Sequence, residues 1–421
     1  MKVALLKNKN RNDSISIGAS VIIDELEQSG VPVTVFTDYQ TAFDYDVVLV
    51  SMTSTECLFD LYGNMYRAGW EKRTFTAIVG GFGCQNPWAL EDFVDYAFFG
   101  RADGQMTRIL QSVRGEADWG YLNAHLAKLD YQRMVSVRQV SELYPRPVRY
   151  GKNHSVWTEK FIGCPHRCKF CHYSWNRKRI GGSTYINDGL SSGSPEIMFA
   201  DICKHNQKFG RFTTALDGYS ERLRYQFGKR ISWQMVEDSL DHVASFRGNT
   251  YIKLYNIHNF PTETDADREE FFRFFENYAA SSMKPDGVLT VEVLNTAFRP
   301  SLNTPMQRLE ARLYPPARYE DNRVAVGDGF VFKMSVNNRD AYSHLQDLIS
   351  IRYQNKHRDI IHYIATDKAF SKLNNAEKLR DITAKFDITD FIRRYSIDEY
   401  MPGDLLISDF EVKKHEKVLL C

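Results

Sequence analysis

The sequence has no long hydrophobic run, no excess of one charge and no even set of cysteines, and each absence narrows what it can encode. No apolar stretch approaches the ~18 residues of a membrane-spanning helix, and the first ten residues have too short an apolar core for a signal peptide. The 54 basic and 53 acidic residues leave a formal net charge of +1. The chain as a whole therefore has no electrostatic preference for nucleic acid or an anionic membrane, although a local basic patch can still bind a nucleic acid.

Cysteine usage points to a reducing compartment. The seven cysteines are an odd number, and three of them lie in one short segment. This distribution disfavours a disulfide framework, so we expect a soluble cytoplasmic protein with no membrane partner. With 421 residues, the chain is long for a single domain, and two or three domains are expected.

Residues 1–113 alternate short apolar runs with amphipathic segments, a pattern typical of a βα repeat around a parallel sheet. The expected strands cover residues 3–6, 31–36, 46–52, 75–80 and 96–100. A helix is expected over residues 17–28, ending at Ser29-Gly30. We therefore predict an α/β protein that begins with an open, doubly wound, Rossmann-like domain. A linker should follow over residues 114–155, where Pro145 and Pro147 favour extended chain.

A second βα series occupies residues 156–309. Its expected strands cover residues 157–162, 184–186, 212–216, 250–255 and 288–294. A partial (β/α) barrel is the simplest arrangement, with its chemistry at the carboxyl ends of the strands. Residues 310–421 begin with a loop region that includes Pro315-Pro316 and Gly327-Asp328-Gly329. Polar, helix-forming sequence follows from Ala341, so a mainly helical C-terminal domain is expected.

Three cysteines, Cys164, Cys168 and Cys171, have C-x3-C-x2-C spacing, which is short enough for one loop to surround a metal centre. Soft thiolates are the usual ligands of iron–sulfur clusters, and three of them leave one iron of a [4Fe–4S] cubane open to a small molecule. Two other interpretations remain. One is a Cys3His zinc site that uses His166 or His172, and the other is an electron-transfer cluster completed by a distant cysteine.

The cysteine segment resembles the signature of radical S-adenosylmethionine enzymes, including the aromatic Phe170 before the third cysteine. Later segments resemble the barrel of the branch of that superfamily in which a cobalamin-binding-like domain precedes the barrel, a branch related to methylthiotransferases. These segments are residues 216–224, Lys229, and residues 251–255, 261–264 and 296–305. The resemblance covers residues 1–310 and is strongest over residues 157–305.

This resemblance implies that the three cysteines hold a [4Fe–4S] cluster whose open iron binds S-adenosylmethionine. One-electron reduction by a flavodoxin- or ferredoxin-type partner would then yield a 5′-deoxyadenosyl radical that removes hydrogen from an unactivated carbon. Glycine turns at Gly80-Gly81 and at residues 99–104 fall where the family places them, which is compatible with cobalamin. No D-x-H-x-x-G segment supplies a histidine ligand for cobalt. Methyl transfer, radical rearrangement and hypermodification of a nucleobase in DNA or RNA all remain open.

The resemblance also suggests contacts to S-adenosylmethionine, expected from Phe170, Asp188, Glu221, Arg224 and Lys253. Asp188 stands where the family has G-G-E and is expected at the methionine amine. Glu221 is expected at the ribose or the amine, with an ion pair to Arg222 or Arg224 as the alternative. Arg224 and Lys253 match the methionine carboxylate in charge.

His258 is the candidate catalytic residue, because a histidine exchanges protons near neutral pH, although a structural hydrogen bond is its commoner role. It lies in the turn before Pro261, where Asn259 can adopt the left-handed backbone that the family obtains from glycine.

Two further features bear on function. A methylthiotransferase would need three cysteines in the front domain, and only Cys57 and Cys84 are there, so buried thiols are expected instead.

Residues 173–179 interleave aromatic and basic side chains, which can hold a flipped base, although a solvated loop is the alternative. A non-catalytic iron–sulfur or zinc protein that binds nucleic acid is the opposed hypothesis.

Overall fold

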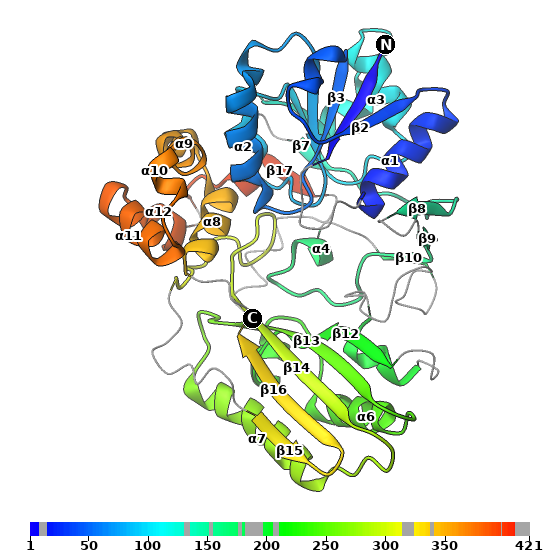
Figure 1. The fold of residues 1–421 in the computed structure, drawn as a ribbon, viewed down its shortest axis with the longest axis vertical. Coiled ribbons are helices and arrows are strands. Elements are labelled where there is room, and N and C mark those ends of the chain that lie inside the picture. Colours follow the sequence, from blue (N-terminus) through cyan, green and yellow to red (C-terminus); the bar gives the residue numbers. More distant parts are fainter. Residues whose placement is uncertain are drawn as a thin grey trace.

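The computed structural model describes residues 1–7, 15–129, 135–150, 155–175, 179–181, 197–204, 210–313, 324–336, 341–396 and 398–408. Two sheets lie at opposite ends of the molecule, with the short helix α4 (His172–Trp175) between them and a group of helices to one side (Figure 1). None of the helices in the described part of the chain is both long and apolar enough to span a membrane.

The front sheet contains the five expected strands. They are β1 (Val3–Lys7), β2 (Val33–Phe36), β3 (Val47–Ser51), β4 (Thr76–Gly80) and β5 (Tyr96–Phe98). They are parallel in the order β2-β1-β3-β4-β5, the doubly wound arrangement that the apolar runs predict. The order of the strands reverses between β1 and β3, so the switch point of this sheet lies there.

Alternate residues of the front strands pack on opposite faces. One face holds Val3, Leu5 and Leu49 against α1 (Ile17–Gln28) and α3 (Met106–Val113). The other face holds Ala4, Leu6 and Val48 against α2 (Cys57–Ala68). The predicted helix over residues 17–28 is confirmed, with Ser16 as its N-cap and Gly30 in the left-handed region at φ 76°.

Residues 114–155 are more structured than the predicted linker. They contribute β6 (Leu126–Lys128), β7 (Val135–Val137) and β8 (Val148–Tyr150). β6 adds an antiparallel edge to the front sheet, β7 pairs with β17 (Leu406–Ser408), and β8 pairs with β9 (Ser155–Trp157). These strands have only three residues each, too short for their alternation to be recognised in the sequence.

The second sheet has the order β12-β13-β14-β16-β15. Its strands are β12 (Arg211–Ala215), β13 (Thr250–His258), β14 (Leu289–Ala297), β15 (Val324–Gly327) and β16 (Phe330–Val336). The first four in spatial order are parallel, and β15 forms an antiparallel hairpin with β16. Helices α6 (Trp233–Ala244) and α7 (Asp265–Ser281) pack their apolar side chains on one face.

Two expectations for this region need correction. Residues 324–336 were expected to be loop, but they form a hairpin whose Gly329 has φ 72°, and β16 belongs to the sheet. Residues 157–162 were expected to form one strand of the sheet. Instead they comprise the end of β9 and then β10 (Phe161–Ile162), which pairs with β11 (Ile180–Gly181) outside the main sheet. The expected strand at residues 184–186 lies outside the described residues.

The helical C-terminal segment shares its hydrophobic core with the front domain. It contains α8 (Ala341–Arg352), α9 (Arg358–Thr366), α10 (Lys368–Ser371), α11 (Asn375–Lys385) and α12 (Thr389–Ile392). Leu345, Leu348 and Ile361 belong to the same apolar cluster as the α2 face of the front sheet. The helices are therefore present as predicted, but they form an outer layer of the front domain.

Candidate metal centre and adjoining cavity

The cysteine segment lies at the carboxyl edge of the second sheet, as the βα pattern predicts. It follows β10 and turns into α4, with the Cys171 amide donating to the Cys168 carbonyl at 3.0 Å. The Trp175 indole donates to the same carbonyl at 2.8 Å. Two hydrogen bonds to the Cys168 carbonyl thus hold the loop backbone, and the loop leads directly into α4.

An apolar cluster attaches the loop to the ends of the strands. Cys168 and Phe170 pack with Phe260, which follows β13, and with Phe298 and Met306, which follow β14. The rings of Phe170 and Phe260 are 5.6 Å apart. The Met306 amide donates to the Lys169 carbonyl at 3.2 Å. Phe170, a predicted cofactor contact, is 8 % exposed and serves here to anchor the loop.

The turn that follows α5 (Glu221–Gln226) forms the other wall of the loop. The Lys169 amide donates to the Phe227 carbonyl at 2.8 Å. Gly228 has φ 84°, and a Cβ at this position would lie 2.5 Å from the Arg167 carbonyl oxygen. Close approach of the two backbones therefore requires glycine here.

A buried ion pair lies beside the thiols. Lys229 Nζ is 2.5 Å from Asp217 Oδ2, and the two side chains are 8 % and 15 % exposed. Burial opposes the charge on Lys229, but Asp217 and then Cys168 hold its pKa above the ordinary value. Burial raises the pKa values of Cys164 and Cys168, and Lys229 lowers both.

The donor set consists of three thiols, which are the usual ligands of an iron–sulfur cluster. Cys168 is buried, Cys164 and Cys171 are half-buried, and none of the three forms a disulfide. Among the described residues, no three His, Cys, Asp or Glu side chains converge to hold one metal ion. His172, considered above as a zinc ligand, has its Nδ1 at 3.0 Å from the Leu302 carbonyl oxygen.

Glu221 and Arg224 have structural contacts. Glu221 is half-buried and accepts from the Trp233 amide at 2.9 Å, so its carboxylate caps α6 rather than pairing with Arg222 or Arg224. Arg224 is fully buried and donates to the carbonyls of Ile231 and Gly218 at 2.7 and 3.2 Å. Its guanidinium lies 4.1 Å from the centre of the Trp233 ring, and burial lowers its pKa to about 10.

Lys253 lies on the face of the second sheet that α6 and α7 leave uncovered. Its Nζ is 5.0 Å from the Tyr255 ring centre, and in the strand register it is opposite Glu292. Lys253 precedes His258, the last residue of β13, by a stretch that corresponds to about 16 Å of strand. Lys253 is therefore far from the cysteine loop. Asp188 lies outside the described residues.

His258 ends β13 on the face that packs against the helices. Its side chain is on the same face of the sheet as those of Ile252 and Leu254, which belong to the core shared with α6 and α7. Burial lowers its pKa to about 4. The following residue, Asn259, has φ 61°, so the predicted left-handed turn is confirmed. A proton-transfer role for His258 has no support from this placement.

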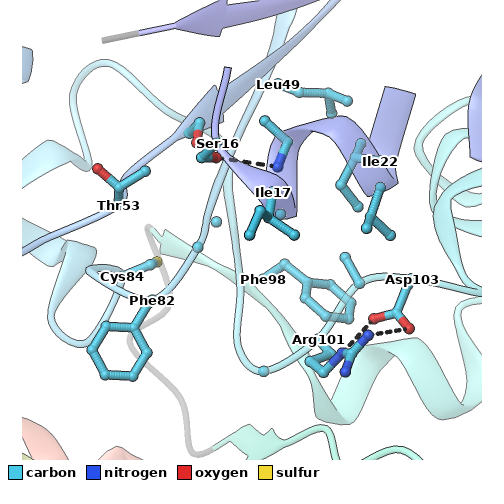
Figure 2. Close-up of a pocket in the computed structure, with 18 of the residues that line it drawn as sticks. Ser16, Ile17, Ile22, Leu49, Thr53, Phe82, Cys84, Phe98, Arg101 and Asp103 are labelled. Atoms are coloured by element: carbon cyan, nitrogen blue, oxygen red, sulfur yellow. Dashed lines mark hydrogen bonds and ion pairs between the residues drawn. The ribbon is translucent and has the colours of Figure 1, made fainter. Parts of the chain in front are cut away.

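A cavity of about 410 Å³ lies at the carboxyl edge of the front sheet (Figure 2). It lies at the switch point, between Leu5 of β1 and Leu49 of β3, and the first turn of α1 lines it. Ile17, Ile22 and Phe98 supply apolar walls, and Ser16, Thr53 and Cys84 supply smaller polar groups. Cys84 and Cys57 are both buried thiols, as expected.

The cavity extends toward the cysteine segment, because His172 and Tyr173 line it directly after the third cysteine. Phe82, on the glycine turn after β4, is 45 % exposed, and its ring lies 5.8 Å from that of His172. Arg101 closes one side with ion pairs to Asp103 at 2.8 Å and Glu159 at 2.7 Å. The cavity and the cysteine loop are therefore neighbours.

The aromatics of residues 173–179 make internal contacts. The Tyr173 hydroxyl accepts from the Gly163 amide at 3.1 Å. Trp175 is buried, and the Arg167 guanidinium lies 5.5 Å from its ring centre. Residues 176–178 lie outside the described residues. These contacts favour a structural role for both rings over binding of a flipped base.

Asp217 and Lys229 have no assigned function in the sequence, where Lys229 is only part of a family-like motif. A signal was present: residues 160–181 and 222–230 contain no Asp or Glu, in a chain whose charges nearly balance. Such local depletion of carboxylates indicates that the cysteine loop lies in a basic environment.

Comparisons with known proteins give structural likenesses only. No family model matches the sequence, and no curated protein shows significant similarity. The cobalamin-dependent S-adenosylmethionine radical enzyme OxsB, solved with aqua-cobalamin and S-adenosylmethionine, is 11 % identical, with a TM-score of 0.44 over 68 % of this chain and 53 % of that chain. Its apo form and its aqua-cobalamin form give TM-scores of 0.31 at 11 % identity, covering 100 % of this chain and 56 % of that chain. This chain thus spans about half the length of OxsB.

Proposed function

We propose that this chain is a radical S-adenosylmethionine enzyme in which Cys164, Cys168 and Cys171 hold a [4Fe–4S] cluster. The observation that carries the proposal is the placement of all three thiols on one loop, anchored at the carboxyl edge of a parallel sheet beside a buried lysine. A three-thiolate loop provides no fourth ligand of its own, which leaves one iron for S-adenosylmethionine.

A cluster held by Cys164, Cys168 and Cys171 would supply the one-electron reduction of S-adenosylmethionine that breaks its sulfur–C5′ bond. Residues of this chain protect that chemistry from solvent, since Phe170, Phe260, Phe298 and Met306 bury the inner side of the loop. Exclusion of water and stray hydrogen donors is the main task of a protein around a cofactor that supplies the reaction itself. The electron would come from a flavodoxin- or ferredoxin-type reductant.

The carboxyl end of the uncovered face of the second sheet, beside the cysteine loop, is the proposed place for the rest of S-adenosylmethionine, in a partial barrel. Lys253, Glu292 and Lys333, side by side in the strand register, lie farther from the loop and are weaker candidates for the methionine carboxylate. Glu221 and Arg224 are held by other contacts, so they are weaker candidates for the cofactor than the sequence suggested.

The proposal is tested by the electron paramagnetic resonance spectrum of the anaerobically reconstituted and reduced protein, with and without S-adenosylmethionine. An open iron predicts that the cofactor changes the spectrum. A spectrum that S-adenosylmethionine leaves unaltered would indicate a cluster with four protein ligands, and one zinc per chain would indicate a structural metal site.

Cobalamin-dependent methyl transfer is a second level of the proposal, favoured by the cavity at the front switch point. The cavity is largely apolar and continues to the cysteine segment, so a group bound there would be near the cluster. Corrinoid absorption in the same preparation, or after incubation with cobalamin, would support this reaction. Its absence after both treatments would favour rearrangement or nucleobase modification, for which the substrate would occupy the cavity.

A further inference from the structure

We propose that the buried pair of Lys229 and Asp217 sets the reduction potential of the cluster held by Cys164, Cys168 and Cys171. Lys229 raises this potential and Asp217 lowers it. The inference rests on the proposed function, because it needs a cluster at the three cysteines. It goes beyond that function by assigning two buried charges opposite effects on the reduction potential, each of which can be measured.

The backbone holds both members of the pair in place. Asp217 follows β12 in the left-handed region at φ 54°. The next amide, of Gly218, donates to Asn256 Oδ1 at 2.7 Å, and Asn256 donates to Asn295 at 3.0 Å. These two buried asparagines fix the Asp217 turn to the ends of β13 and β14. A left-handed backbone is uncommon for an aspartate, so the surrounding contacts must hold Asp217 in this conformation.

Lys229 is fixed equally firmly on the other side. Its amide donates to the Arg224 carbonyl at 2.8 Å, and its own carbonyl accepts from the Ile231 amide at 2.8 Å. The residue before it, Gly228, contacts the cysteine loop, since a Cβ there would lie 3.6 Å from Cys168 Cα. The ammonium group therefore lies in the wall of the cysteine loop and has little access to water.

Lys229 is the member of the pair that the backbone brings to the loop. It follows Gly228, which packs against the Cys168 backbone, and Asp217 is placed there by its ion pair with Lys229. Asp201, a further carboxylate, is occupied by an ion pair with Lys204. No carboxylate of residues 160–181 or 222–230 offsets Lys229, since those segments contain none.

The electrostatic consequence follows from charge counting. An oxidised [4Fe–4S] core with three thiolates has a net charge of −1, and uptake of one electron from a one-electron donor makes it −2 without forming or breaking a bond. A buried cation stabilises the more negative state and a buried anion destabilises it, the more so in a medium of low dielectric constant. Cluster potentials respond to such local charges.

The test is an anaerobic redox titration of the reconstituted protein, followed by electron paramagnetic resonance and performed without S-adenosylmethionine. Lys229→Met leaves Asp217 unopposed and should lower the midpoint potential. Asp217→Asn leaves Lys229 unopposed and should raise it. Each change should alter the ratio of reduced to oxidised cluster at a fixed potential about tenfold, which equals about 59 mV for a one-electron couple.

Two further variants separate charge from packing. Lys229→Arg keeps the cation and should stay close to wild type, while the double variant Lys229→Met/Asp217→Asn should return toward it. Lys284→Met removes another buried lysine, whose Nζ donates to the Ala244 carbonyl at 2.9 Å at the opposite edge of the sheet. This control should leave the potential unchanged.

The outcomes distinguish this inference from the proposed function. Shifts of opposite sign in the two single variants support the pair as the determinant of potential. Shifts of the same sign, or none in variants that retain wild-type iron, overturn it and leave a structural ion pair. If Lys229→Met does not hold iron, Asp217→Asn still decides the sign of the effect, because its predicted shift is upward. Absence of any cluster in the wild-type protein would instead refute the proposed function.

Discussion

Gly228 shows how one residue can control the metal loop without contacting a metal. Its backbone is left-handed, and a Cβ there would lie 2.5 Å from the Arg167 carbonyl oxygen, so a side chain would displace the cysteine loop. Gly248 also has a left-handed backbone, at φ 69°, but a Cβ there would have nothing within 4 Å. An alanine at Gly248 would strain only the backbone, whereas an alanine at Gly228 would also displace the cysteine loop. Comparing the two substitutions therefore separates these two effects.

We expect Gly228→Ala to bind less than about half of the wild-type iron per chain after anaerobic reconstitution, because the loop must move to accept the methyl group. Gly248→Ala should keep wild-type iron and lose only about 1 kcal/mol of unfolding free energy, the usual cost of a left-handed alanine. Iron and protein assays on both variants provide the measurement. Equal iron in the two variants would show that close backbone contact is not needed for the site.

Some residues of the candidate site can be recognised in the sequence, and others only in the fold. Cys164, Cys168 and Cys171 are identified by spacing, because metal ligands on one loop must be near in sequence. Lys229 and Asp217 reach the same place through the turn after α5 and the end of β12, and only the fold brings them to the loop. Where Lys253 and His258 point depends on strand alternation and on their depth along β13, which residue chemistry alone does not reveal.

At the scale of elements, α8 connects the two halves of the molecule. Asp347 is 2 % exposed and accepts from Thr55 of the front domain at 3.1 Å and from Arg299, after β14, at 2.7 Å. At the end of the same helix, Arg352 donates to the Gln307 carbonyl at 3.1 Å, and Asn86 of the front domain donates to the Ile351 carbonyl at 2.9 Å. α8 thus joins the front domain to the segment that follows β14.

Asp347→Ala should lower the unfolding free energy by about 1–3 kcal/mol, because Thr55 loses a buried partner while Arg299, 40 % exposed, can regain water. Asp265→Ala removes a carboxylate that is 85 % exposed and pairs with Arg268, and it should change stability by less than ~0.5 kcal/mol. Urea midpoints of both variants are the measurement. A loss for Asp347→Ala no greater than for the control would contradict the bridging role of α8.

At the scale of the whole molecule, the two sheets direct their carboxyl edges toward a common region that contains the cavity and the cysteine loop. The βα periodicity predicted the parallel strands of the front sheet and β12, β13 and β14 of the second sheet, since apolar runs alternate with amphipathic helices. It could not show that the C-terminal helices complete the front-domain core, because periodicity identifies an apolar face but not its partner. The hairpin of β15 and β16 was missed for a related reason: Val324 and Val326 are exposed on an edge strand, and the glycines of its turn resemble a loop.

The central claim is that the cysteine loop supports reductive cleavage of S-adenosylmethionine. Its most direct test is the amount of 5′-deoxyadenosine formed by the reconstituted, reduced protein, compared with Cys168→Ala and with Cys203→Ala, which changes an exposed cysteine outside the loop. We predict formation by the wild type and by Cys203→Ala, with at least a hundredfold loss in Cys168→Ala. A wild-type protein that holds its iron and forms no 5′-deoxyadenosine, or a Cys168→Ala variant that forms as much, would contradict the account.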